Sequence, residues 1–260
     1  MALASSINGK SLAPAKPEAL LFGARTDISG KPIKNVVLLS IPDEEFKLLR
    51  PHLEPLELPQ YMVLEEPGEK IRFAYFLNEG MTSLVASSSD GRSVEVGLVG
   101  REGMVGMPVT VGLKTGSFRA IMQIAGSGLG IESIVLEQIL LAAPQLRNEL
   151  SRYTMMRAMQ TAQLVACNRL HDIEQRLARW LLMCQDRVDS PQLYLTHEFL
   201  AQMLGTGRPS VTLAAGILEN AGTIENQRGT VRILNRKSLE GAACECYRVI
   251  QNFNGGLGLK

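Results

Sequence analysis

The sequence of 260 residues has little cysteine, no long apolar run and no excess of either charge. Four cysteines are too few and too unevenly spaced for a disulfide framework in a chain of this length, which favours a reducing compartment. No run approaches the roughly 18 apolar residues of a membrane helix, and the N-terminus lacks the apolar segment of a secretory signal. We therefore expect a cytoplasmic protein without a membrane partner. The four cysteines are Cys167, Cys184, Cys244 and Cys246.

The balance of charge gives no signal for nucleic-acid binding at the level of the whole chain. Lysine and arginine total 27 residues against 26 aspartate and glutamate residues, so any attraction to phosphate must be local. Apolar residues make up 45% of the chain, which is ample for a buried core. The length allows one large domain or two ordinary ones, and we favour two domains with tails.

The most informative stretch, residues 193–234, predicts a helix-turn-helix followed by a β-wing. Thr196 precedes an apolar-periodic run, and its hydroxyl can accept a hydrogen bond from a free N–H group of the first helical turn. Gly205 and Gly207 then end this short helix and provide the permissive backbone of a tight turn. The inward stripe of the helix consists of Phe199, Leu200 and Leu204.

A second helix follows the turn, and Pro209 suits its first turn because the missing N–H group costs little there. Gly222 ends this helix. Residues 223–233 then alternate apolar and polar side chains around a turn at 227–229, which predicts a β-hairpin whose tip Arg228 makes basic. The packing face of the second helix consists of Val211, Ala214, Ala215 and Leu218.

The outward face of the second helix carries Arg208, Ser210 and Thr212, which can donate hydrogen bonds to phosphates or base edges. The helix dipole opposes a cation at a helix start, so the position of Arg208 indicates an anionic partner. The alternative is that Arg208 is only a solvated surface residue. We predict that double-stranded DNA is the partner and that Arg228 of the wing also contacts it.

The N-terminal half predicts a β-rich domain. Residues 1–34 show no sustained period and predict a flexible leader, and a short helix is expected at 42–50. From Leu56 to Ile131, short alternating runs are separated by glycine-containing turns, which predicts six to eight strands in an antiparallel sandwich or barrel. The interior of that barrel is the natural ligand site.

Helical spacing resumes at residues 132–142, Pro144 interrupts it, and a long helix is predicted from Gln145 to about Asn168. Its apolar stripe is wider than one barrel face needs, so a second copy of the helix is the economical partner. The alternative is a long helix that lies on its own barrel, and methionines suit either arrangement. The stripe consists of Leu146, Leu150, Tyr153, Met156, Met159 and Leu164.

Residues 170–188 predict another amphipathic helix, with Leu170 on its inward face and Arg176 and Arg179 on its outward face. This helix begins the second domain. A last helix is expected from Arg236 to Tyr247, before a flexible glycine-rich tail. The other inward residues of the amphipathic helix are Ile173, Leu177, Trp180, Leu181 and Cys184, and the other outward ones are Asp172 and Glu174.

Three segments carry a family resemblance: RLARWLL at 176–182, LTHEFLAQMLGTGRPSVT at 195–212 and GTIENQRGTVRIL at 222–234. With the region of glycine-rich turns and the long helix that precede them, they resemble the Crp/Fnr transcription regulators. The resemblance spans roughly residues 36–250 and is strongest in the C-terminal third.

The resemblance implies an α+β fold. An antiparallel β-roll, also called a double-stranded β-helix, is the sensory domain, and a long dimerisation helix joins it to a winged helix-turn-helix domain. The domains expected are a flexible leader at 1–34, the β-roll at 35–143, the dimerisation helix at 144–168, the winged domain at 169–250 and a flexible tail at 251–260.

The resemblance also implies partners. A homodimer joined along the long helix would use the apolar stripe defined above as its interface. Two winged domains would read a near-palindromic DNA site whose half-sites lie about one helical turn apart, with RNA polymerase as a further partner. At the matching positions, Arg208 would read a base, and Thr196 and His197 would touch phosphate.

The β-roll departs from relatives that bind cyclic nucleotides, which place Gly-Glu at the ribose and Arg-Ser at the cyclic phosphate. The corresponding pairs here are Gly106-Met107 and Ser117-Phe118, so a buried phosphate would stay largely unpaired. Arg119 lies two positions late, on the same strand face as Ser117. We expect no binding of cyclic AMP. The candidate effector pocket, Gly106, Met107, Ser117 and Arg119, is left to an unknown small molecule, unless the β-roll holds the dimer constitutively.

No cofactor is evident from the sequence. Oxygen-sensing relatives hold an iron–sulfur cluster with N-terminal cysteines, and no cysteine here precedes Cys167, which excludes that sensor. Haem needs an axial ligand, and no histidine falls clearly in the β-roll. Cys244 and Cys246 are a weak metal signal without a second pair nearby in sequence, so no metal site is predicted. The three histidines are His52, His171 and His197.

Two other functions compete with DNA binding. A protein-interaction module that uses the winged domain should present an aromatic anchor on the second helix, whereas Arg208, Ser210 and Thr212 are polar donors. An enzyme would need histidine, cysteine or paired acids at the mouth of the barrel, and the sequence places none there. We therefore predict a DNA-binding regulator that is not an enzyme and has no catalytic residues.

Overall fold

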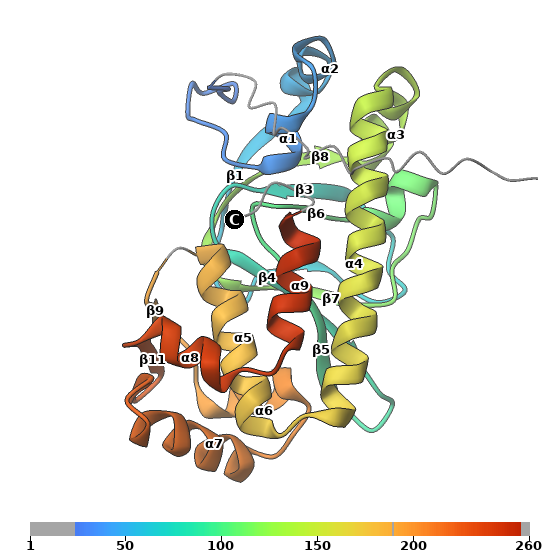
Figure 1. Ribbon diagram of the computed structural model, residues 1–260. Helices are drawn as coiled ribbons and strands as arrows, with labels where there is room; N and C mark the ends of the chain where they lie inside the picture. Colours follow the sequence, from blue (N-terminus) through green and yellow to red (C-terminus); the bar gives the residue numbers. More distant parts are fainter. Residues whose placement is uncertain (1–23, 189, 256–260) are drawn as a thin grey trace, which may run out of the picture.

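The computed structural model describes residues 24–188 and 190–255 (Figure 1). A β-rich region comes first, a long helix follows it, and a helical region with a small sheet completes the chain. The predicted α+β fold is therefore present. Residues 1–23 of the expected leader and residues 256–260 of the expected tail lie outside the described residues.

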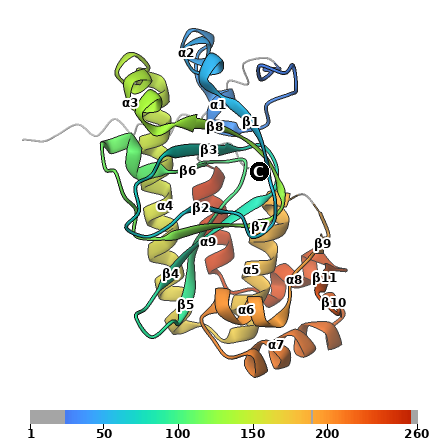
Figure 2. The same ribbon diagram turned by 180° about the vertical axis from the view of Figure 1, so that it is seen from behind.

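Two antiparallel sheets of four strands each form the β-roll, in the orders β1-β8-β3-β6 and β2-β7-β4-β5 (Figure 2). Apolar side chains from both sheets fill the space between them, among them Met122 and Leu58. The described residues between 54 and 132 contain eight strands, at the upper end of the six to eight that were predicted. The strands are β1 (Glu54–Leu58), β2 (Val63–Glu65), β3 (Phe73–Leu77), β4 (Met81–Ser87), β5 (Ser93–Val99), β6 (Met104–Val105), β7 (Arg119–Ile124) and β8 (Gly126–Glu132).

Two short helices, α1 (Val36–Ser40) and α2 (Asp43–Leu49), precede the β-roll, and the sequence predicted only the second. The expectation of a flexible leader is wrong for residues 24–34. Arg25 is buried there, and its guanidinium donates to the Ile41 carbonyl oxygen at 2.6 Å and to Asp43 Oδ1 at 2.7 Å. This segment is therefore attached to the first two helices.

Helix α3 (Ser133–Ala142) packs beside the β-roll, and the long helix α4 (Pro144–Leu170) follows it directly. The N-terminus of α4 is capped by a side chain from another helix. The buried carboxylate of Glu45 in α2 accepts from the backbone N–H groups of Gln145, at 3.0 Å, and Leu146, at 2.8 Å. An acid at this position satisfies free N–H groups and is favoured by the helix dipole.

The stripe on α4 that was predicted as a dimer interface lies mostly inside the same chain. Leu146, Leu150, Tyr153 and Leu164 are buried, and Met156 is half-buried. Met159 is the one member of the stripe with substantial exposure, 41%. The prediction is wrong for the four buried residues because α4 rests on the β-roll and is also covered by the C-terminal helix.

The winged domain begins with α5 (Ile173–Val188), and its helix-turn-helix and wing agree with the prediction. Two residues of the helix predicted at 170–188 were misplaced. Leu170 is exposed at the end of α4, and Arg179 of α5 is buried rather than outward. The remaining elements are β9 (Gln192–Leu193), α6 (His197–Leu204), α7 (Arg208–Asn220), β10 (Ile224–Gln227), β11 (Thr230–Ile233), α8 (Arg236–Ala242) and α9 (Cys246–Gly255).

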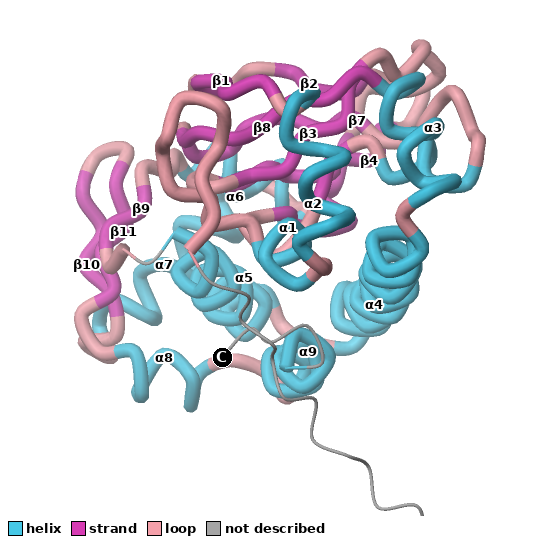
Figure 3. Tube along the Cα trace, turned by 90° about the horizontal axis from the view of Figure 1, so that it is seen from above, coloured by secondary structure: helices cyan, strands magenta, loops and turns pink. Residues whose placement is uncertain are grey.

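The end of the chain differs from the single helix that was predicted at 236–247. Helix α8 ends at Ala242, a short segment follows, and α9 runs from Cys246 to Gly255. Helix α9 packs against both α4 and α5 and lies between them (Figures 1 and 3). The expectation of a flexible tail from residue 251 is therefore wrong for residues 251–255.

Buried polar contacts join the winged domain to the β-roll. The Trp180 indole nitrogen in α5 donates to Glu95 Oε1 in β5 at 2.9 Å, and the second oxygen of Glu95 accepts from the Ser83 hydroxyl at 2.8 Å. Arg187 of α5 pairs with Glu102, with 2.7 Å between Nε and Oε1. No helix within the described residues has the length and apolar character needed to span a membrane.

Candidate nucleic-acid interface

Helix α6 begins as its capping residue predicted. The Thr196 hydroxyl accepts from the backbone N–H of Phe199 at 3.2 Å, which satisfies one of the free donors of the first turn. Gly205 ends the helix in the left-handed conformation, with φ of 59°, and its N–H returns to the carbonyl oxygens of Ala201 and Gln202. The turn into α7 is therefore set by local sequence.

Helix α7 has one buried face and one exposed face, as the spacing predicted. Val211, Ala214, Ala215 and Leu218 are buried against the rest of the winged domain. The opposite face is exposed along the helix and begins with Arg208, the first residue of α7. The residue before it, Gly207, provides no side-chain cap for the helix N-terminus. The exposed residues of this reading face are Arg208, Ser210, Thr212, Leu213 and Ile217.

His197 lies at the centre of the motif rather than free at its surface. Its Nε2 is 2.8 Å from the Asn226 side-chain nitrogen in β10, and its Nδ1 is 3.0 Å from the Thr212 hydroxyl. The Thr212 hydroxyl in turn donates to the Arg208 carbonyl oxygen at 3.1 Å. These contacts fit a neutral imidazole with its proton on Nδ1, which holds α6, α7 and the wing together. Sequence reasoning missed this role because Asn226 is distant in sequence.

The wing is a hairpin of β10 and β11 whose turn carries Arg228, exposed at the tip. Gly229 has φ of 75°, which a residue with a Cβ adopts only with strain. The Asn226 N–H donates to Glu219 Oε1 of α7 at 2.9 Å, which fixes the hairpin to the end of the reading helix. Strand β9 adds a third strand through Leu193 opposite Val231, and the sequence did not predict it.

A groove of about 1120 Å³ separates the β4–β5 turn from the helix-turn-helix. Residues 86–94 line one side, and residues of α6 together with Arg208 line the other. The Gln202 side chain spans the two sides and donates to the Ser93 hydroxyl at 2.7 Å. The first residue of α7 therefore lies beside the β-roll.

The four candidate effector residues do not form a pocket with a positively charged side chain that is available to a ligand. Gly106 and Met107 lie at the start of a 3-10 turn, Met107–Val111, and Ser117 is exposed. Arg119 is paired with Glu66, with 2.9 Å between its Nη2 and Oε1. None of the three cavities that we describe in residues 24–188 and 190–255 includes these positions.

Glu65 is a carboxylate that the sequence analysis did not single out. It accepts from the backbone N–H of Gly106, and partial burial raises the pKa of Glu65 from 4.5 to about 6. The Glu65 carboxylate thus occupies the backbone N–H of Gly106. An anionic ligand at this position would need that hydrogen-bond donor for itself.

Four potential metal ligands meet at the end of α4. Cys167 and His171 lie there with Cys244 and Cys246, and their ligand atoms are all within 4.8 Å of one another. Cys244 and Cys246 have no second pair nearby in the sequence, but the fold brings Cys167 and His171 next to them. Sequence reasoning missed the group of four because Cys167 and Cys244 are 77 positions apart.

A β-roll, a long helix and a winged helix-turn-helix follow one another along the chain, which is the order that the resemblance to Crp/Fnr regulators implied. Residues 175–242 match a family model described as the Crp-like helix-turn-helix domain. The match lies within the winged domain, and it agrees with the resemblance predicted from the sequence of that domain.

Three proteins found by comparison are similar to most of the chain. The global nitrogen regulator of Synechococcus elongatus is 25% identical over 200 residues, which cover 71% of this chain and 89% of that protein. A CRP-family transcriptional regulator from Thermus thermophilus has a TM-score of 0.60 at 22% identity, covering 74% of this chain and 99% of its own. The c-di-GMP responsive global regulator CLP of Xanthomonas campestris has a TM-score of 0.62 at 18% identity, with 74% and 99% covered. All three of these proteins are named as regulators.

Proposed function

We propose that the protein is a dimeric transcription regulator that binds a specific DNA site through its winged helix-turn-helix domain. The observation that carries this proposal is the reading face of α7. That face is exposed along the helix, begins with an arginine and has its opposite side buried, while a second arginine stands at the tip of the adjoining wing. A helix presented in this way fits the major groove of B-DNA.

Each residue of the reading face has a chemistry suited to one part of the duplex. Arg208 can donate two hydrogen bonds to O6 and N7 of a guanine. Leu213 and Ile217 are exposed apolar side chains on the same face, and they suit the methyl groups of thymines. Arg228 at the wing tip is placed for a phosphate, and Thr196 lies exposed at the start of α6 for the same role. His197 acts through Thr212 and Asn226, which it positions.

The surface that fits a second copy of the chain lies on the exposed side of α4, opposite the stripe that is buried. Its positions repeat at intervals of three and four residues, which is the spacing of a coiled-coil seam. Met155 and Val165 on this seam are 63% and 66% exposed. The two alanines between them, Ala158 and Ala162, would allow two helices to approach closely. The α4 seam consists of Asn148, Ser151, Met155, Ala158, Ala162 and Val165.

A two-fold dimer of this kind sets the form of the DNA site. Two copies of α7 related by the α4 seam would enter successive major grooves on one side of the duplex. The operator would then be near-palindromic, with half-sites about 34–36 Å apart.

The β-roll supports a role other than cyclic-nucleotide binding. Arg119 is engaged by Glu66, and the Glu65 carboxylate accepts from Gly106. A cyclic phosphate would therefore meet an acid and no free cation at these positions, which is unfavourable for a buried anion. Calorimetric titration of the protein with cyclic AMP is expected to give no binding heat, and saturable binding would contradict this part of the proposal.

The experiment that tests the function compares the affinity of the full chain for its own upstream DNA with that for a scrambled duplex of equal composition. The titration is repeated over a series of salt concentrations. Preference for the upstream sequence, with affinity that falls steeply as salt rises, supports the proposal. Equal affinity for both duplexes, in the purified protein and after addition of cell extract, would contradict it.

An arginine substitution assigns the interaction to the reading face. Arg208→Ala should weaken specific binding by about 1–3 kcal/mol and relax the choice of base at one position in each half-site. Arg72→Ala is the matched control, because Arg72 is exposed on the β-roll away from the reading face. Dimerisation should be the same in both variants. Unchanged operator affinity in Arg208→Ala would refute the role of this residue.

A further inference from the structure

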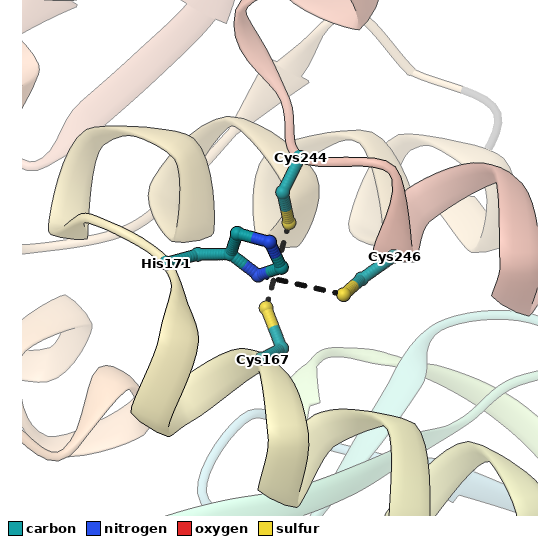
Figure 4. Close-up of side chains that lie close together, drawn as sticks. All are labelled: Cys167, His171, Cys244 and Cys246. Carbon is teal, nitrogen blue, oxygen red and sulfur yellow. Dashed lines mark hydrogen bonds between the residues drawn. The ribbon is translucent and has the colours of Figure 1, made fainter.

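The group of ligands at the end of α4 is built from three separate segments of the chain. Cys167 is in the last turns of α4, His171 follows that helix, Cys244 lies between α8 and α9, and Cys246 begins α9. Figure 4 shows that the four side chains point toward one another, with the imidazole ring of His171 facing the sulfur atoms. All three sulfur atoms belong to free and buried cysteines.

The distances within this group match those around a single tetrahedral ion. The Sγ atoms of Cys167 and Cys244 are 3.5 Å apart, and Cys246 Sγ is 3.6 Å from Nδ1 of His171. Zinc bonds of about 2.3 Å to sulfur and about 2.0–2.1 Å to nitrogen, at tetrahedral angles, place neighbouring ligand atoms roughly 3.5–3.8 Å apart. All four ligand atoms lie within 4.8 Å of one another. Shifts of no more than about 1 Å would therefore bring them to the separations expected around one ion.

We propose that Cys167, His171, Cys244 and Cys246 bind one Zn²⁺ ion in each chain. Binding would form three zinc–sulfur bonds and one zinc–nitrogen bond, and each thiol would release its proton to solvent. Three cysteines and one histidine are a ligand set typical of structural zinc sites that leave no open coordination position. The tetrahedral arrangement of sulfur and nitrogen donors favours zinc over the other divalent ions common in cells.

Residues around the four ligands resemble the outer shell of a metal site. Glu245 Oε1 is 3.1 Å from Nε2 of His171, the ring nitrogen that faces away from the cysteines. A carboxylate in this position orients the imidazole and holds the proton on the nitrogen that does not bind metal. The Gln163 side-chain amide donates to the sulfur of Cys246 at 3.0 Å.

The charge around the group also suits a metal–thiolate site. Three thiolates and one Zn²⁺ ion carry a net charge of minus one. Arg176 and Arg179 interact electrostatically with Cys167 from the neighbouring helix α5. Arg179 is buried, and its Nε has no hydrogen-bond partner among the described residues. Cations near a buried anionic complex reduce the cost of its burial.

Two other uses of these cysteines fit the geometry less well. A disulfide between Cys167 and Cys244 would need their sulfur atoms to approach from 3.5 Å to about 2.05 Å, and it would leave His171 and Cys246 without a role. An iron–sulfur cluster distributes its four protein ligands over two or four iron atoms, so the ligands as a set stand further apart than those of a single ion. The close convergence of all four atoms favours one ion.

The location gives the ion a structural effect that reaches beyond the site. His171 is the residue at which α4 ends, and α5 begins two positions later at Ile173. One ion would therefore tie the end of the proposed dimer helix to the segment between α8 and α9, across the connection from α4 to the winged domain. This tie also accounts for the break between α8 and α9, because a continuous helix would carry Cys244 and Cys246 to different faces.

The experiment is elemental analysis of the full chain, purified under reducing conditions without added chelator and then supplied with Zn²⁺ and desalted. We expect one zinc per chain and four thiols that become titratable after unfolding in chelator. In a chain loaded with Co²⁺ instead, thiolate-to-cobalt charge-transfer bands and the visible bands of a tetrahedral ion are expected. DNA is absent, so the result does not depend on the proposed function.

Substitutions identify the ligands. Cys244→Ser and Cys246→Ser should each lose the stoichiometric zinc and the charge-transfer bands, and Glu245→Gln should weaken zinc affinity roughly 10–100-fold. Cys184→Ala is the matched control and should retain one zinc, because Cys184 is buried in α5 outside the group. Circular dichroism checks that each variant is folded.

Three outcomes would overturn the proposal, and the first two use the unmodified chain. These are less than stoichiometric zinc in the reduced chain after exposure to Zn²⁺, and a Cys167–Cys244 disulfide in place of free thiols. The third is zinc retained in full by both serine variants. A different ion with the same dependence on these residues would overturn the assignment to zinc.

Discussion

At the scale of single residues, the contact between the β-roll and the winged domain depends on buried charges that are paired across it. Glu102 and Arg187 are each 3% exposed, and their carboxylate and guanidinium meet at 2.7 Å. Arg187 also donates to the Met183 carbonyl oxygen within α5. Burial of such a pair is tolerable only while both partners are present, since either one alone would be an uncompensated charge in the interior.

Glu102→Ala should therefore lower the free energy of unfolding by about 3–5 kcal/mol, because it leaves Arg187 buried and unpaired. Urea denaturation followed by tryptophan fluorescence measures the change, since Trp180 lies at the same junction. Glu66→Ala is the control, because it breaks a partly exposed pair with Arg119 and should cost at most about 1 kcal/mol. Equal losses in the two variants would show that Arg187 finds another partner or that water reaches it.

A second residue at this junction makes stability depend on pH. Burial raises the pKa of Glu95 from 4.5 to about 7, although Ser83 and Trp180 donate to its carboxylate and Arg179 and Arg187 lie within electrostatic reach. Below pH 4.5 the carboxyl group is protonated in both the folded and unfolded chains. As pH rises through 7 the folded chain must ionise a buried acid, so this contribution to stability is lost between these two values.

The prediction is that Glu95→Gln removes this loss. Relative to the unmodified protein, the variant should gain stability as the pH is raised from about 5 to about 8, by roughly 2–3 kcal/mol. Thermal unfolding of both proteins at each pH gives the difference and cancels the titration of all other groups. A difference that is the same at both pH values would mean that Glu95 titrates normally in the folded chain.

At the scale of elements, local sequence signals were enough to predict the helix-turn-helix. They were insufficient to predict the contacts that other segments make with it. The cap at Thr196, the turn at Gly205 and the proline in the first turn of α7 each act within a few residues, so the sequence shows them directly. The burial of Arg179 and the third wing strand β9 depend on partners far along the chain. The same applies to the attachment of Arg25 and to the break after α8, which no periodicity reveals.

The long helix α4 shows how this limit affects a functional prediction. Its most apolar side was taken as the dimer interface, yet the β-roll and α9 bury that side within one chain. The less apolar α4 seam remains available, and it carries the small residues Ser151, Ala158 and Ala162. Hydrophobicity alone cannot tell which of two faces of a helix meets its own chain, because both burials gain the same free energy per unit area.

The α4 seam makes a prediction about assembly. Ala158→Glu combined with Ala162→Glu should dissociate the dimer, because two acids from each chain would face each other across a close helix contact. Leu48→Glu on α2 is the control, since Leu48 is exposed and lies on another element. Analytical ultracentrifugation should find a folded monomer for the first and a dimer for the second. A dimer in the double variant would place the interface elsewhere.

At the scale of the whole molecule, the position of each reading helix depends on the connection between α4 and α5. Buried contacts of Glu95 and Glu102 hold α5 against the β-roll, and α9 fills the space between α4 and α5 (Figure 3). The proposed zinc site lies where these parts meet. A dimer reads two half-sites together only if both winged domains keep a fixed orientation to the α4 seam, so the rigidity of this connection bears directly on operator affinity.

Removal of the metal should therefore weaken operator binding while the dimer stays intact. Ordering one or two residues at the connection costs about 1–2 kcal/mol each, so an affinity lower by roughly tenfold or more is expected for the chelated protein. Fluorescence anisotropy with a labelled operator, before and after chelation and again after return of Zn²⁺, measures the change. Cys184→Ala should respond as the unmodified chain does, whereas Cys246→Ser should bind weakly throughout and show no response to zinc. Equal affinity with and without the ion would leave the metal site in place but would show that the packing of α9 alone fixes the winged domain.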